Sequence, residues 1–169
     1  MRVLVFGAGA LGSALGGILA RKHAVILVGR KANMDAIRRD GLCLSGELEL
    51  ESEVEACESV DGLAPPDLIL LTTKAYDTKS AVVSLSEPAW RDASVLTLQN
   101  GLGNLEVLRA WKGHKAFGGT TTMGAQLVSA GHVKVSGLGR VVIGADQDEA
   151  GAREIADMFS GCGLTASVT

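Results

Sequence analysis

The segment GAGALG at Gly7–Gly12 restricts the possible folds of this chain more than any other feature. A short apolar run, Arg2 to Phe6, comes directly before it, and small and apolar residues recur at helical spacing from Ala10 to Lys22. A second apolar run, Ala24 to Val28, is too short to form a helix of its own. The pattern predicts a strand, a glycine turn, a helix and a second strand parallel to the first.

Each glycine of the turn has its own task in a dinucleotide site. Gly7 allows a tight turn, Gly9 lets the backbone approach the pyrophosphate, and Gly12 lets the helix pack closely on the strand. The anion then faces the amino end of the helix. Glycines that only pack a turn are the alternative, since glycine supplies 22 of 169 residues. The predicted cofactor-binding residues of the turn are Gly7, Ala8, Gly9, Ala10, Leu11 and Gly12.

The residue at the end of the second strand indicates which cofactor is bound. A site for NAD usually places Asp or Glu there, where it binds the ribose 2′-hydroxyl. This chain has Arg30 instead, followed by Lys31. Both cations are suited to the 2′-phosphate of NADP, and the alternative is that they are solvated loop charges. The sequence therefore predicts NADP as the cofactor, bound by Arg30 and Lys31.

Strand and helix patterns continue to alternate through the middle of the chain. A short helix over Met34–Arg39 is followed by a hairpin with one solvated face over Leu42–Val54. The alternating units then favour a parallel sheet with helices on both faces. Their predicted ranges are Asp67–Thr73, Ala75–Leu85, Ala93–Leu98, Leu102–Trp111 and Ala116–Gly119.

The pattern changes beyond Thr120, where short strand candidates separated by small residues predict an antiparallel meander. A final helix over Asp148–Phe159 and a strand over Leu164–Val168 complete the chain. The predicted fold class is α/β, a Rossmann-type doubly wound and mostly parallel sheet with an antiparallel C-terminal extension. A length of 169 residues without a linker predicts one domain over residues 1–169.

Composition excludes several classes of function. A net charge of −3 disfavours a sequence-independent nucleic-acid binder, so a small-molecule partner is expected. No apolar stretch is long enough to span a bilayer and no signal-peptide pattern is present, so a cytoplasmic protein with no membrane partner is expected. No metal site or disulfide framework is predicted, because the three cysteines are an odd number and form no CxxC pair. They are Cys43, Cys57 and Cys162.

Polar residues follow three further strands at the edge where parallel sheets bind ligands. Lys74 follows one buried strand and Asn100 follows the next, while Thr120–Thr122 lies at the end of a third. Each has a simpler interpretation. Lys74 suits a surface position at the start of a helix, Asn100 a turn, and the threonines a strand. The residues alone leave these alternatives open.

Taken together, the motifs resemble the ketopantoate reductase (2-dehydropantoate 2-reductase) family. The matching segments occur in the family's order over essentially the whole chain: GAGALG, Arg30, TTKAYDT around Lys74, LQNGLG around Asn100, and GTTTMGA ending at Ala125. The resemblance implies NADPH-dependent reduction of a 2-oxo acid in pantothenate synthesis. It also implies that Lys74, Asn100 and Ala125 contact cofactor, with Lys74 and Asn100 nearest the nicotinamide.

The chain also departs from the family pattern. Family members continue into a helical domain that supplies the general-acid lysine, a glutamate and most substrate contacts, and that domain is absent from these 169 residues. No catalytic residue is therefore assigned within the chain, and the isolated chain is expected to be poorly active or inactive. Met123 replaces a histidine found in some relatives, which leaves the substrate open.

Three functions remain as hypotheses. The first is the cofactor half of such a reductase, completed by a homodimer partner or by a separate helical partner. The second is a non-catalytic NADP-binding or sensing module, and the third is the cofactor domain of another 2-oxo or 3-hydroxy acid dehydrogenase. Retention of Lys74 and Asn100 favours the first.

Overall fold

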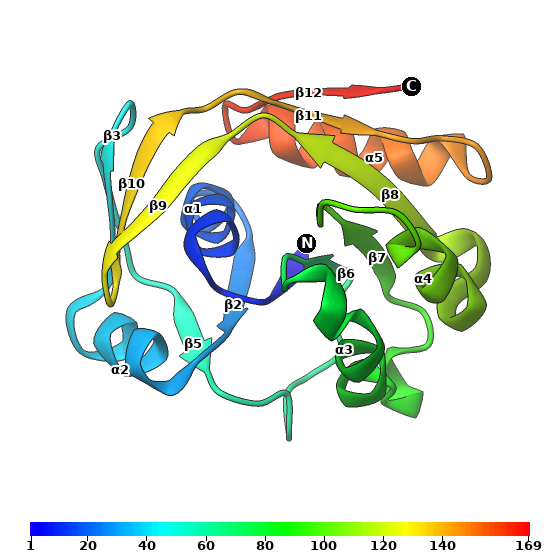
Figure 1. The fold of residues 1–169 in the computed structure, drawn as a ribbon, viewed down its shortest axis with the longest axis horizontal. Helices are drawn as coiled ribbons and strands as arrows, with labels where there is room; N and C mark the ends of the chain where they lie inside the picture. The colour runs from blue at the N-terminus through cyan, green and yellow to red at the C-terminus, as the bar shows by residue number, and fades with distance from the viewer.

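The computed structural model describes all residues 1–169 and contains two sheets (Figure 1). The larger sheet has the order β12-β11-β8-β7-β6-β1-β2-β5. Its strands are β1 (Arg2–Phe6), β2 (Ala24–Val28), β5 (Glu55–Cys57), β6 (Leu68–Leu71), β7 (Ser94–Thr97), β8 (Ala116–Thr121), β11 (Arg140–Ile143) and β12 (Thr165–Val168). The strands from β5 to β8 are parallel, whereas β11 runs antiparallel to β8 and parallel to β12. The predicted α/β class is confirmed.

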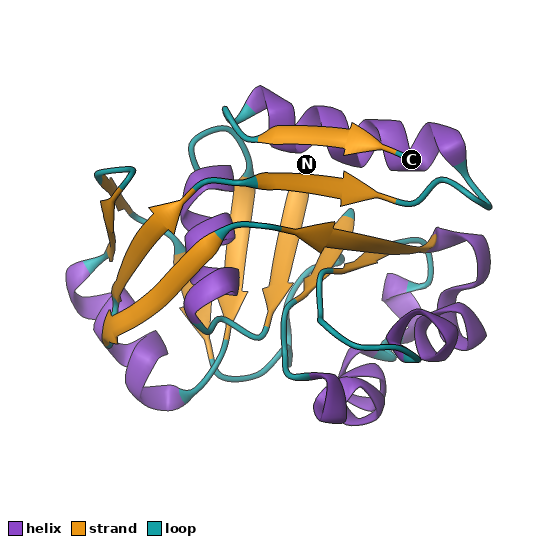
Figure 2. Ribbon diagram, turned by 45° about the horizontal axis from the view of Figure 1, so that its top comes forward, coloured by secondary structure: helices purple, strands orange, loops and turns teal.

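The two faces of this sheet belong to separate apolar cores, because successive side chains of a strand point in opposite directions. Val3 and Val5 pack with α1 (Ala10–Leu19) and α5 (Glu149–Gly161). Leu4, between them, packs with α3 (Thr78–Leu85) and α4 (Asn104–Lys112) on the other face. Figure 2 shows the helices on both sides of the strands. Sheet and helices therefore form the doubly wound arrangement predicted from the alternating pattern.

A smaller sheet covers α1 from the side away from the main sheet. It has the order β4-β3-β10-β9. Its strands are β3 (Leu42–Gly46), β4 (Leu50–Ser52), β9 (Gly124–Ser129) and β10 (His132–Gly137). In Figure 1, α1 lies enclosed between β2 and β9. A helix that is apolar and small all round is stable only when it is buried on every side, and every residue from Gly12 to Leu19 is buried.

Adjacent glycines of α1 allow both sheets to approach it. A Cβ on Gly16 would collide with Leu27 of the main sheet. A Cβ on Gly17 would lie 2.9 Å from Leu42 Cδ2 of the small sheet. The high glycine content is thus used partly in close packing between layers.

The prediction of an antiparallel meander beyond Thr120 is wrong in its strand pairing. β9 and β10 do form an antiparallel hairpin, but β10 then pairs in parallel with β3, and β11 returns to the main sheet beside β8. The reason is the buried helix α1, whose outer side needs an apolar cover that local hairpins alone would not supply. Sequence spacing carries no information on this long-range pairing.

Several element boundaries also differ from prediction. The helix after β2, α2, is longer than expected (Lys31–Asp40), and α1 ends before the basic residues at its predicted end. The helix predicted after Lys74 begins as a 3₁₀ turn, η1 (Ala75–Asp77), before α3. Short 3₁₀ turns η2 (Pro88–Trp90) and η3 (Gly113–Lys115) complete the elements. The edge strand β5 was not predicted, because three residues carry no periodic pattern.

None of the helices combines the length and the hydropathy that crossing a bilayer requires. All three cysteines are free thiols. No group of three His, Cys, Asp or Glu side chains lies close enough together to hold a metal ion.

Candidate functional site

The carboxyl ends of β1, β2, β6 and β7 lie at one edge of the main sheet, because these strands are parallel. β2 and β5 extend the sheet on one side of β1, whereas β6, β7 and β8 extend it on the other, so the strand order reverses at β1. Ligands of open α/β sheets bind at such a switch point. The structure therefore brings the glycine turn, Arg30, Lys74 and Asn100 to a single edge.

The glycine turn is held by backbone contacts that tolerate no side chain at two positions. Gly7 has a φ of 106°, in the region that favours glycine, and a Cβ there would lie 2.5 Å from the Thr73 nitrogen. A Cβ on Gly12 would lie 2.5 Å from both Gly7 O and Thr72 Oγ1. Thr72 Oγ1 donates a hydrogen bond to Gly7 O at 2.9 Å. These glycines serve the tight turn and the helix–strand contact predicted for them.

Gly9 differs from both, because space is open around it. A Cβ built on Gly9 would meet no atom nearer than Gly7 O, at 4.0 Å. The backbone N–H groups of Leu11 and Gly12, in the first turn of α1, donate to no protein acceptor. Free N–H groups and the positive end of the helix dipole attract an anion. The turn thus has the open cradle that a pyrophosphate group requires.

Arg30 and Lys31 lie at the end of β2 and the start of α2, but only one is free. Lys31 Nζ forms ion pairs with Asp35 at 3.1 Å and Glu58 at 3.6 Å. The hydrogen bond to Asp35 raises the pKa of Lys31, and the same bond lowers the pKa of Asp35. Arg30 is exposed and makes no ion pair or side-chain hydrogen bond. Arg30 is therefore the available cation at this end of the site.

Lys74 and Asn100 lie at the other end, on the loops after β6 and β7. Both are exposed, and neither side chain has a protein partner. The two loops approach each other closely, since a Cβ on Gly101 would lie 3.9 Å from Ala75 Cβ. Two large apolar side chains beside them, Tyr76 and Leu102, are also exposed. This part of the edge offers a free ammonium and a free amide next to apolar surface.

Ala125 lies in the second sheet, at the beginning of β9 and opposite Val135 of β10. It is half-buried and packs against the core around α1. β8 ends at the same edge as β7, and the chain passes from there through Thr122 and Met123 to Ala125. Ala125 thus lies just after the connection between the two sheets, and its contact with the cofactor stays a prediction.

Two polar residues that organise the site were missed in the sequence. Gln99, at the end of β7, hydrogen-bonds to the loop that carries Lys74. Asn33, buried in α2, donates from Nδ2 to Ala8 O of the glycine turn at 2.9 Å. The position of Gln99 beside Asn100 was the one available signal. A single polar residue in an amphipathic helix gives no signal for Asn33.

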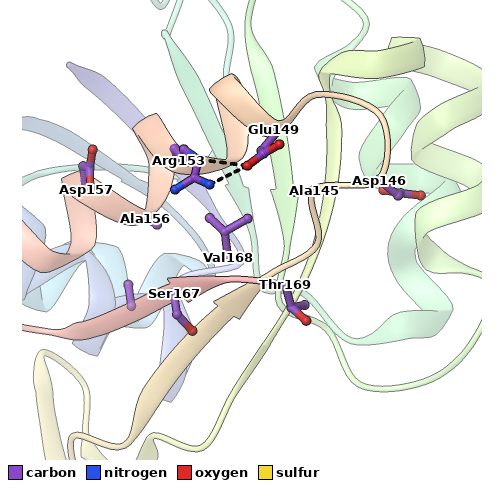
Figure 3. A pocket seen from close by; sticks show the side chains of 10 residues that line it. Ala145, Asp146, Glu149, Arg153, Ala156, Asp157, Ser167, Val168 and Thr169 are labelled. Carbon is purple, nitrogen blue, oxygen red and sulfur yellow. Dashed lines mark hydrogen bonds and ion pairs between the residues drawn. The ribbon is translucent and has the colours of Figure 1, made fainter.

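A cavity of about 610 Å³ lies between α5 and β12, away from all the predicted site residues. β11 and β12 run opposite to β8, so their carboxyl ends point to the other edge of the sheet. Figure 3 shows Glu149 and Arg153 joined by an ion pair on α5, with the side chain of Val168 pointing toward them. Arg153 is already paired with Glu149 and Asp146 with Arg109, and the cavity lies away from the predicted residues, so it is not a candidate catalytic site.

Comparison with known proteins agrees with this geometry. Residues 3–148 match the sequence profile of the family described as ketopantoate reductase PanE/ApbA. The chain is 40% identical to a 2-dehydropantoate 2-reductase of Pyrococcus horikoshii, covering 100% of this chain and 56% of that protein. It is 37% identical to the corresponding protein of Halobacterium salinarum, covering 100% and 58%. The chain spans just over half the length of these curated relatives.

Solved structures show the same similarity. A PanE/ApbA family ketopantoate reductase from Ralstonia eutropha JMP134 superimposes with a TM-score of 0.91 and 30% identity, covering 100% of this chain and 56% of that one. The ternary structure of D-mandelate dehydrogenase with NADH and anilino(oxo)acetate gives 0.90 and 29%, covering 100% and 57%. The fold is therefore shared with a ketopantoate reductase family protein and with D-mandelate dehydrogenase.

Proposed function

Because this chain belongs to the ketopantoate reductase PanE/ApbA family, we propose that it supplies the NADPH-binding half of an enzyme that reduces a 2-oxo acid. Its proposed substrate is 2-dehydropantoate and its product pantoate. The proposed setting is the cytoplasm. Groups beyond this chain, from a helical domain or a partner chain, would complete the substrate site.

The observation that carries the proposal is the open cradle at Gly9. The space beside Gly9 and the unpaired N–H groups of Leu11 and Gly12 fit an anionic group of pyrophosphate size. Gly7 and Gly12 are closed by backbone and side-chain contacts, so the opening is confined to one position of the turn. A turn that only packed strand on helix would not need this space.

Arg30 supports NADP rather than NAD. An unpaired guanidinium at the end of β2 suits the 2′-phosphate, because arginine binds phosphate oxygens through two parallel hydrogen bonds. Lys31 is held by two carboxylates and would contribute only by releasing them. D-mandelate dehydrogenase is described with NADH, so the fold alone does not choose the cofactor. The side chain at position 30 would make that choice.

Lys74 and Asn100 would place the reacting end of the cofactor and the substrate. When bound, the nicotinamide supplies the hydride that reduces the carbonyl carbon. The ammonium of Lys74 would attract the negative charge that develops on the carbonyl oxygen, and Asn100 would donate or accept a hydrogen bond beside it. Protonation of the resulting alkoxide would need an acid held beside that oxygen. The exposed edge of the sheet in this chain would not hold such an acid in place.

The test is a cofactor titration together with an assay on the same purified chain. NADPH should bind, while NADPH oxidation with ketopantoate should stay far below the usual enzymatic range of about 1–10³ s⁻¹. Failure to bind NADPH would contradict the proposal as a whole. Turnover within that range would instead show that the acid lies in this chain and would give the role to Lys74.

The similarity to D-mandelate dehydrogenase favours a second candidate, reduction of another 2-oxo acid. The two candidates differ only in the side chain of the 2-oxo acid. Assays with ketopantoate and with a phenyl-substituted 2-oxo acid distinguish them, using the chain together with the proposed helical domain or partner chain. Preference for ketopantoate supports the first candidate.

A further inference from the structure

Gln99 lies between the two loops that carry Lys74 and Asn100. Backbone pairing of β6 with β7 ends at Leu71 and Thr97, and the last backbone hydrogen bond between the segments runs from Leu98 N to Leu71 O at 3.3 Å. Beyond that bond no backbone hydrogen bond joins the two loops. Another interaction must therefore fix their separation.

The side chain of Gln99 provides this connection. Its Nε2 group donates to Thr73 O at 3.0 Å and lies 3.2 Å from Lys74 O. Its Oε1 accepts a hydrogen bond from Thr97 Oγ1 at 3.0 Å, which holds the amide in one orientation. The amide thus reaches from its own loop to the carbonyl groups of the peptide bonds before and after Lys74.

The same amide continues into the helices behind the loops. Gln99 Nε2 donates to Thr78 Oγ1 at 3.1 Å, and Thr78 Oγ1 lies 2.9 Å from Asn104 Oδ1. Asn104 Nδ2 in turn donates to the carbonyl oxygens of Asn100 and Gly101, both at 3.3 Å. Thr78 and Asn104 are buried. The network returns to the loop on which it began and contacts the backbone carbonyl groups of both Lys74 and Asn100.

We propose that Gln99 is a positioning residue that holds the Lys74 and Asn100 loops at the separation required by the nicotinamide end of the cofactor. The inference rests on the proposed function and adds a residue to it. Only an amide supplies the donors for the Lys74 loop and the acceptor for Thr97 from one side chain. Gln99 itself touches no reacting atom in this role.

The two ends of the site make the inference testable without an activity assay. NADPH spans both ends, whereas 2′,5′-ADP carries the adenosine and the 2′-phosphate but no nicotinamide. Gln99→Leu keeps the approximate size and removes every hydrogen bond of the side chain. It should weaken NADPH binding roughly tenfold and change 2′,5′-ADP binding less than about twofold. Gln147→Leu, an exposed glutamine at the opposite edge, is the matched control and should change neither affinity.

Titrations by calorimetry, with urea unfolding of each variant, separate the outcomes. Equal losses for the two ligands would overturn the inference, because a general disturbance of the fold has that effect. An unchanged NADPH affinity in Gln99→Leu would also overturn it. If Gln99→Leu does not fold, Gln99→Glu, which keeps the acceptor and loses the donors, must show the same separation. Wild-type protein that binds neither ligand would instead refute the proposed function.

Discussion

Asn33 Oδ1 accepts a hydrogen bond from the backbone N–H of Gly131 at 2.8 Å, although the two residues are 98 positions apart. The Nδ2 group of the same side chain donates to Ala8 O at 2.9 Å. One buried amide therefore joins the glycine turn of the main sheet to the β9–β10 turn of the small sheet. This bond fixes the cover of α1 relative to the cofactor turn.

Replacing Asn33 by Ala should lower the free energy of unfolding by roughly 2–4 kcal/mol, because it leaves a buried donor and a buried acceptor without partners. Urea unfolding measures the change. Asn100→Ala is the matched control, since Asn100 is exposed and its side chain makes no hydrogen bond; its effect should stay within about 0.5 kcal/mol. Equal effects of the two substitutions would contradict the role assigned to Asn33.

Alanine at Gly9 and at Gly12 should have opposite consequences. Gly12→Ala places a methyl group 2.5 Å from Gly7 O and should destabilise the fold by roughly 1–3 kcal/mol. Gly9→Ala meets only open space, so the stability should be unchanged within about 0.5 kcal/mol. The new methyl group should nevertheless reduce NADPH affinity by roughly tenfold or more. Thermal unfolding and a cofactor titration on both variants check this, and normal NADPH binding by Gly9→Ala would rule out the cradle.

Arg30→Ala should weaken NADPH binding by about tenfold to a hundredfold, because a hydrogen bond to a charged group contributes roughly 1.5–3 kcal/mol. NADH binding should barely change. Lys31→Ala is the control. It should lose less NADPH affinity than Arg30→Ala, because Lys31 is already paired with Asp35 and Glu58. Titrations that show equal losses of NADPH and NADH in Arg30→Ala would mean that Arg30 supports the fold.

His23 should make the protein less stable in mild acid. Its pKa lies below the usual value of 6.5 because of partial burial and because the N-terminal ammonium of Met1, 3.4 Å from Nδ1, repels a second positive charge. The unfolded chain then binds more protons than the fold, so this contribution is complete above about pH 6.5. It is lost as the pH falls toward the folded pKa.

Urea midpoints at pH 7.5 and 5.5 measure the effect of His23. The difference between the two midpoints should be smaller in His23→Gln than in the wild type, because glutamine does not titrate. Lys22 also repels the imidazolium and remains in both proteins. An identical pH dependence of the two proteins would exclude His23 as its source.

The local chemistry of the sequence was sufficient to predict the central parallel strands of the main sheet, from β1 to β8, and the position of the glycine turn. Val3, Leu4 and Val5 before GAGALG specify a buried strand and a turn, and both depend on residues that are neighbours in the chain. Because parallel strands end at one edge, the gathering of Arg30, Lys74 and Asn100 also follows from their positions after strands. The tasks of Gly7 and Gly12 agree with the space around them.

Only the tertiary structure decided how these parts are held together. β10 pairs with β3, and Lys31 pairs with Glu58 whereas Arg30 stays free. Asn33 and Gln99 likewise bond to groups far away in the sequence. Hydrophobic periodicity indicates which face of a helix or strand is buried, but it does not indicate which other element packs against that face. Polar side chains such as these are satisfied by whichever groups the packed chain places within about 3 Å, so their partners are fixed only when the layers have come together.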